Sequence, residues 1–134
     1  MNMLQQEKRF KFSKSERLKY RSVIDQLFAK GTAINKYPVQ VMYLFASDVQ
    51  YPGIQAGFAV PKRLVRRAVD RIKIKRLMRE AYRLQKPELH QNIDSRAGLY
   101  LMFIYKSKTI PTYQEIDEKI KTIIERLQNR IKVS

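Results

Sequence analysis

A run of seven apolar residues, Leu99 to Tyr105, constrains the fold of this chain more than any other segment. It is far too short to cross a membrane, because a membrane-spanning helix needs about 20 apolar residues. In a β-strand successive side chains point to opposite faces, so an unbroken apolar run predicts a strand that is covered on both sides. The chain must therefore contain elements that cover both faces of a sheet.

An amphipathic helix is predicted between Ser22 and Lys30, where apolar residues recur at helical spacing. Gly31 is the expected C-cap. Two starts fit the sequence: an early one with a capping box of Ser13 and Glu16, and a later one with Ser22 as N-cap.

A last helix is predicted to open with the capping box Thr112-Tyr113-Gln114-Glu115. The positions that follow carry an apolar stripe at intervals of three and four residues: Ile116, Ile120, Ile123, Ile124, Leu127 and Ile131. One face of this helix is therefore expected to be buried.

A third predicted helix is basic. On a helical wheel that starts at Arg71, an apolar stripe and a set of cations lie roughly opposite each other. The stripe consists of Ile74, Leu77, Met78, Ala81 and Leu84, and the cations are Arg71, Lys75, Arg76, Arg79 and Arg83. Asp70 is the expected N-cap, and Pro87 is the expected end of the helix.

Two further strands are predicted, Val39 to Phe45 and Ile54 to Val60. Their short connection predicts an antiparallel hairpin, and an additional short strand near Ile34 or Lys36 is left open. The order is helix, strand, strand, basic helix, strand and helix, with the additional strand optional. This order indicates an α/β fold, an α+β sandwich in which helices pack on one sheet.

The charge of the chain points to a polyanionic partner. Twenty-eight Lys and Arg residues against twelve Asp and Glu residues give a net charge of +16 and a pI of about 10.3. Such an excess repels itself in a folded protein, and nucleic acid is the commonest partner at this density. The length and the lack of a linker predict one domain over residues 1–134, of which residues 1–12 form a basic N-terminal arm.

The cations are densest between Lys62 and Lys86, where eleven Lys and Arg residues accompany only Asp70 and Glu80. A solvated helix face, the usual role of a charge run, would carry interleaved acids as i,i+4 partners. The scarcity of acids favours a phosphate partner. A second basic run, residues 8–21, has aromatic residues between its charges, which could stack on unpaired bases or anchor the segment to the core.

Residues that could perform chemistry are scarce. The chain has no cysteine and one histidine, His90, and its four glycines are scattered, so neither a cysteine-based zinc site nor a glycine-rich phosphate loop is predicted. No catalytic residue, metal site, bound cofactor or small-molecule substrate is expected. The N-terminus lacks the apolar stretch of a secretory signal, so a cytoplasmic location without a membrane partner is expected.

Two stretches resemble the bacterial ribonuclease P protein family. Gly57-Phe58-Ala59-Val60-Pro61-Lys62-Arg63 is similar to its motif Gly-Phe/Leu-x-Val-Ser/Pro-Lys-Lys/Arg, and Ala68 to Arg83 is similar to its motif Ala-Val-x-Arg-Asn-Arg-x-Lys-Arg-x-x-Arg-Glu-x-Phe/Tyr. Leu27 to Gly31 is similar to the end of the first helix of the family. The chain departs from the pattern at Ile72, where the family has Asn, and at Lys73, where the family has Arg.

The resemblance implies that the chain is the protein subunit of an endoribonuclease that matures the 5′ ends of tRNAs. In that enzyme the RNA subunit, with its Mg²⁺ ions, performs the cleavage. The residues implied to bind this catalytic RNA are Arg71, Lys73, Lys75, Arg76 and Arg79, with Lys62 and Arg63 nearby. The family fold has a left-handed crossover around the basic helix, an exception to the general rule of handedness.

The resemblance also implies a cleft for the 5′ leader of precursor tRNA, between the first helix and the sheet. Its lining from the helix would be Ile24 and Phe28, and its lining from the strands would be Val39, Val41, Tyr43 and Ala59.

The chief alternative is a ribosomal protein or an assembly factor that binds ribosomal RNA, since charge and fold class allow it. A helix-turn-helix DNA-binding protein would need a small helical fold, which the apolar strands argue against. A protein nuclease would need a metal-binding or general-base cluster, and none is evident in the sequence. The motif over Arg71 to Arg83 favours the ribonuclease P protein over all three.

Overall fold

The computed structural model describes residues 16–46, 53–90 and 97–133. In these residues, helices and strands follow one another in the predicted order, and the optional short strand near Ile34 is present. The elements are α2 (Arg21–Lys30), β1 (Thr32–Lys36), β2 (Val39–Ala46), β3 (Gly53–Ala59), α3 (Ala68–His90), β4 (Gly98–Tyr105) and α4 (Tyr113–Val133). The predicted α/β fold class is confirmed.

The strands form one sheet in the order β1-β2-β4-β3. β1 pairs with β2 and β2 with β4 in antiparallel fashion, whereas β3 and β4 are parallel, so α3 is the crossover between adjacent parallel strands. The predicted hairpin of β2 and β3 is therefore wrong, because β4 lies between them. A central position suits the unbroken apolar sequence of β4, since it provides neighbours at both edges and cover on both faces. The hairpin partner of β2 is β1.

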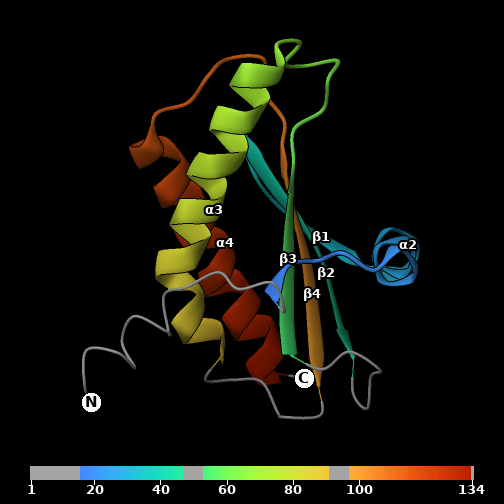
Figure 1. The fold of residues 1–134 in the computed structure, drawn as a ribbon. Coiled ribbons are helices and arrows are strands. Elements are labelled where there is room, and N and C mark those ends of the chain that lie inside the picture. The colour runs from blue at the N-terminus through green and yellow to red at the C-terminus, as the bar shows by residue number, and fades with distance from the viewer. Residues whose placement is uncertain (1–15, 47–52, 91–96, 134) are drawn as a thin grey trace, which may run out of the picture.

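Helices cover both faces of the sheet (Figure 1). α3 and α4 lie against one face, and α2 lies against the other. Alternate side chains of β4 point to the two faces of the sheet. Leu101 and Phe103 belong to the core under α3 and α4, while Tyr100 packs with Val23 and Leu27 of α2. The coverage predicted for this strand is confirmed.

The apolar stripe predicted for α4 is buried along its whole length, from Ile116 to Ile131. The predicted capping box precedes it: the Glu115 N–H donates to Thr112 Oγ1, and the Thr112 N–H donates to the Glu115 carboxylate, both at 3.2 Å. These bonds satisfy backbone donors that the first turn of a helix otherwise leaves without acceptors.

Helix α2 begins two residues before the later of the two predicted starts, which has Ser22 as N-cap. Tyr20 is its N-cap and makes no side-chain capping bond, so Ser22 lies inside the helix and does not cap it. Ser13, of the alternative capping box, lies outside the described residues. Gly31 is the C-cap as predicted, and its N–H donates to the Leu27 carbonyl. A Cβ at this position would lie 2.3 Å from the Leu27 carbonyl oxygen, so glycine is required by close approach.

Helix α3 is longer than predicted at both ends. It begins at Ala68, so Asp70 lies in its first turn and pairs with Arg67 at 4.0 Å, and is not the N-cap. Pro87 lies inside the helix and does not end it. The helix continues to His90, and this added turn buries Leu89 completely. That burial offsets the backbone hydrogen bond that a proline cannot donate.

The buried face of α3 is rotated from the predicted stripe. Ile74, Met78 and Ala81 are fully buried as expected, but Leu84 is 44% exposed. Tyr82 and Lys86 are buried instead. The rotation brings Tyr82 to the ring of Phe58 in β3 and Lys86 to the carboxylate of Glu16.

Candidate nucleic-acid interface

The outward face of α3 and the loop before it are rich in exposed cations. Along the loop Lys62, Arg63, Arg66 and Arg67 are exposed, and along the helix Lys73, Arg76 and Arg79 are exposed and Lys75 is partly buried. Most of the predicted RNA-binding residues are therefore exposed on α3 and the loop before it, a set that we call the α3 basic face. Its members are Lys62, Arg63, Arg66, Arg67, Lys73, Lys75, Arg76 and Arg79.

Few acids accompany the cations of this region. Glu80 pairs with Arg83 at 2.5 Å, and the guanidinium of Arg83 holds the pKa of the Glu80 carboxyl below its usual range. Asp70 contacts Arg67 at 4.0 Å. Among the residues that the structure describes, no carboxylate lies within 4.0 Å of the remaining cations of the α3 basic face. Their repulsion is therefore not relieved by described acidic side chains, and a polyanion would relieve it.

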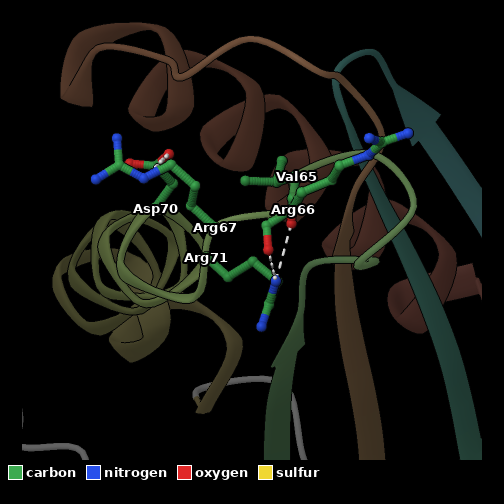
Figure 2. A network of polar contacts seen from close by, with 5 residues as sticks. All are labelled: Val65, Arg66, Arg67, Asp70 and Arg71. Carbon is green, nitrogen blue, oxygen red and sulfur yellow. Dashed lines mark hydrogen bonds and ion pairs between the residues drawn. The ribbon is translucent and has the colours of Figure 1, made fainter.

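Arg71 holds the basic loop against the start of α3 (Figure 2). Its Nη1 donates to the Val65 carbonyl at 3.0 Å and to the Arg66 carbonyl at 2.7 Å. Val65 itself is buried, while the side chains of Arg66 and Arg67 extend to opposite sides of the loop. Arg71 was predicted to meet RNA directly; that remains a prediction, but the structure gives this side chain a positioning contact that the sequence did not reveal.

Arg79 extends the basic face towards the edge of β3. Its guanidinium lies 5.9 Å from the centre of the Phe58 ring, which in turn stacks on Phe103 with 5.5 Å between the ring centres. A pocket of about 190 Å³ lies here, lined by Arg79 and Phe58 and by Arg17, Leu18, Ala56 and Gly57. The edge of the basic face is therefore partly aromatic.

Arg17 was not among the predicted site residues, yet the structure brings it beside Arg79. The segment that carries it adds to the free edge of β3: Arg17 forms a parallel bridge with Ala56, and the Leu18 N–H donates to the Ala56 carbonyl at 3.0 Å. The basic run of residues 8–21 was a signal that this segment could contribute. Its pairing with β3 could not be read from spacing alone.

Lys86 was counted among the basic block but does not belong to its surface. The side chain is 1% exposed, and its ammonium donates to both carboxylate oxygens of Glu16 at 2.7 Å. Its charge is therefore used inside the protein to hold the segment that carries Arg17.

The predicted leader cleft is only partly assembled. Ile24 is half-buried and Phe28 is 51% exposed, so both lie at the margin where α2 meets solvent. Val39, Val41 and Tyr43 are on the opposite face of the sheet, and their predicted place in a cleft beside α2 is wrong. Val39 and Val41 are buried under α3 and α4, and the Tyr43 hydroxyl accepts a bond from Arg130 of α4 at 2.9 Å.

The strand residues that do face α2 are those between the predicted ones. Met42 and Leu44 of β2, with Tyr100 and Met102 of β4, pack around Val23 and Leu27. The correction follows from the alternation of side chains, which sends neighbours in a strand to opposite faces. Ala59 comes directly after Phe58 of the α3–α4 side, and so it lies on the α2 side as predicted.

No group of three or more His, Cys, Asp and Glu side chains with metal-binding geometry occurs among residues 16–46, 53–90 and 97–133. None of the described helices has the length and apolar character to span a membrane.

The sequence of the chain is similar to proteins of one family. The sequence model of the family described as Ribonuclease P matches residues 12–128. The ribonuclease P protein component of Porphyromonas gingivalis is 33% identical over 124 residues, which cover 91% of this chain and 90% of the relative. That of Chlorobaculum tepidum is 33% identical over 140 residues, which cover 96% and 91%.

Solved structures show the same fold. The RNase P protein of Staphylococcus aureus superposes with a TM-score of 0.67 at 19% identity and covers 84% of this chain and 94% of its own. The RNase P protein of Thermotoga maritima superposes with a TM-score of 0.62 at 22% identity, with coverages of 83% and 96%.

Proposed function

Because the chain belongs to the ribonuclease P protein family and is a subunit of the enzyme that processes the 5′ ends of tRNAs, we propose that its α3 basic face binds the catalytic RNA of that enzyme. The observation that carries the proposal is the set of exposed cations on α3 and its loop, which have no acidic partner among the described residues apart from the Asp70 contact of Arg67. Cations in such an array release counterions from a nucleic acid when they contact its phosphates, and this release drives binding.

The roles within the enzyme are those that membership of the family implies. The chain contributes charge and shape, and the cleavage itself, with its Mg²⁺ ions, is assigned to the RNA partner. Precursor tRNA is the expected substrate of the assembly, and the cytoplasm is its expected location.

The leader of the precursor is proposed to pass along the side of the sheet that α2 covers. Phe28 supports this path because about half of its surface, 51%, is exposed next to the packed residues Val23 and Leu27. An exposed aromatic ring can stack on an unpaired base, whatever the base sequence. With Val41 and Tyr43 removed from the lining, the cleft would consist of Ile24, Phe28 and Ala59, with Met42 and Met102 at its floor.

The first test is reconstitution. The full chain is combined with a ribonuclease P RNA, and cleavage of precursor tRNA is measured at low magnesium concentration, where we expect the protein to increase the rate. Failure of the protein to bind this RNA, or to increase the rate, would contradict the proposal. Site-specific cleavage by the RNA-free protein would contradict the assignment of catalysis to the RNA.

The second test addresses the basic face itself. The triple variant Lys73→Gln, Lys75→Gln, Arg76→Gln should bind the RNA more weakly, and the slope of log K against log salt should fall by about 0.7 to 0.9 for each phosphate that the protein no longer neutralises. The matched control removes the same charge elsewhere: Lys108→Gln, Lys119→Gln, Lys121→Gln. An equal reduction of the slope in both variants would show that net charge, and not the α3 basic face, determines binding.

A further inference from the structure

Two apolar side chains lie exposed at the start of the basic helix. Val69 is 59% exposed and Ile72 is 64% exposed. They are three positions apart in α3, so they are neighbours on one side of the helix, and we call them the Val69–Ile72 patch. Neither contributes to the core, which α3 reaches through Ile74, Met78 and Ala81. Packing of the protein therefore gives no reason for an isoleucine at position 72.

The surroundings of the patch are cationic on both sides. Towards the C-terminus, Arg76 lies one turn after Ile72, and Lys73 lies one turn after Val69, both exposed. Towards the N-terminus the patch meets the loop that carries Arg66 and Arg67, which Arg71 holds in place. A second copy of this chain would bring the same positive charges together, and a neutral apolar partner would leave them desolvated. A polyanion that also presents apolar surface fits both properties.

RNA is such a partner. Between its phosphates it exposes ribose C–H groups and, where bases are unpaired, their faces. Resting on the proposed function, we propose that the Val69–Ile72 patch is a nonionic contact within the RNA interface, which packs on sugar or base surface while Lys73 and Arg76 meet the flanking phosphates. At position 72 this chain carries an isoleucine where the family motif has a polar Asn.

The nature of the contact determines what it contributes. Removing apolar surface from water releases no counterions, so its share of the affinity does not depend on salt. An Asn at this position could form a hydrogen bond with a polar atom of the RNA. The side chain of Ile72 can contribute to affinity only by excluding water from apolar surface. The contributions of the patch and of the cations can therefore be separated in a plot of log K against log salt concentration. The Val69–Ile72 patch contributes to the intercept of this plot, and the cations determine its slope.

The experiment uses the full chain and a ribonuclease P RNA, with binding measured over a series of salt concentrations. We expect Ile72→Asn to weaken binding by about five- to tenfold, the effect of losing the apolar surface that Ile72 would bury against the RNA, with no change in slope. Ile72→Leu, which keeps the apolar surface, should bind like the original protein. The matched control is Leu84→Asn on the same helix, an exposed apolar residue five positions beyond Arg79, the last cation of the α3 basic face, which should have no effect.

Several results would overturn the inference. Binding of Ile72→Asn that is equal to or tighter than that of the original chain would show that the isoleucine makes no favourable contact. An altered salt slope would show that the substitution disturbs the cations. Sedimentation that reveals a dimer, absent in Ile72→Asn, would assign the patch to a second copy of the chain. If the original chain fails to bind the RNA at all, the proposed function itself is refuted. If it binds and Ile72→Asn binds as the original does, the inference alone is refuted.

Discussion

The ammonium group of Lys86 donates to both carboxylate oxygens of Glu16, each at 2.7 Å, across 70 positions of sequence. Lys86 is 1% exposed, and a buried ammonium is stable only with a compensating partner. The pair ties the segment that carries Arg17 to α3, beside the free edge of β3. The position of Arg17 beside Arg79, at one end of the α3 basic face, thus depends on the buried ion pair of Lys86 and Glu16.

Glu16→Gln should destabilise the fold, because it leaves the Lys86 charge buried without its carboxylate. We expect a loss of about 3 kcal/mol in the free energy of unfolding, measured by urea denaturation. The double variant Glu16→Gln, Lys86→Met should recover part of this loss, since it removes the buried charge as well. If the double variant is no more stable than the single one, the pair is not the cause of the loss.

Stability should fall as the pH rises above about 10, the ordinary pKa of tyrosine. Burial, with a smaller contribution from the Glu16 carboxylate, raises the pKa of Tyr82 well above that value. The unfolded chain then releases a proton that the folded protein keeps, so unfolding becomes easier by about 1.4 kcal/mol per pH unit for this group. Tyr82→Phe should make the decline in urea-determined stability less steep by this amount, and an unchanged decline would assign it to other groups.

Phe28→Ala should separate leader recognition from stability. A fully buried phenylalanine costs about 3 to 5 kcal/mol when truncated, and the half-exposed ring of Phe28 should cost about half as much or less. Binding of precursor tRNA by the reconstituted enzyme should weaken by about 1 to 3 kcal/mol, the value of one stacked base, while binding of mature tRNA stays nearly constant. Tyr113→Ala, at an exposed aromatic residue of α4, is the control. Equal weakening of both substrates would remove Phe28 from the leader path.

Arg71 and Arg76 should differ in kind, although both belong to the same motif. Arg71→Gln removes the two bonds to the Val65 and Arg66 carbonyls and should lower stability by about 1 to 2 kcal/mol, with faster amide exchange in the loop. Arg76→Gln, at an exposed position, should leave both quantities unchanged and weaken RNA binding alone. A stable Arg71→Gln variant with an unaltered loop would mean that these bonds do not organise the loop.

Sequence patterns predicted the positions of helices and strands more accurately than they predicted which strands pair in the sheet. The apolar periods of α4 and β4 report burial directly, so their faces were predicted correctly, and the motif around Arg71 to Arg79 located the basic helix. Strand neighbours were missed because a short connection between β2 and β3 allows a hairpin but does not require one, and β4 competes for the same edges. The sequence predicts that α3 ends at Pro87, whereas the helix continues beyond it. The burial of Leu89 that favours this continuation depends on tertiary contacts, which a local pattern does not reveal.

The site was predicted unevenly for the same reason. Cations that face solvent can be found from composition and helical spacing, and the structure places those of α3 on one surface. Val41 and Tyr43 were assigned to the wrong side because a mapping by position does not say which face of a sheet a strand residue serves. The internal roles of Lys86 and Arg71 depend on Glu16 and on two loop carbonyls, and no local pattern encodes such contacts.

The central position of β4 has a consequence for the order in which the protein can fold during synthesis. β2 and β3 are synthesised before β4, which lies between them in the sheet. Neither strand can pair with β4 until the whole of α3 has been synthesised, because α3 precedes β4 in the chain. Until residue 105 is available, the β1–β2 hairpin keeps an unpaired edge, and α3 emerges with its cations complete but without the finished sheet beneath it. A nascent chain that stops before Gly98 thus carries the helix for RNA contact and lacks the scaffold that orients it. Its RNA-binding surface can become ordered only after β4, which ends at Tyr105, has been made.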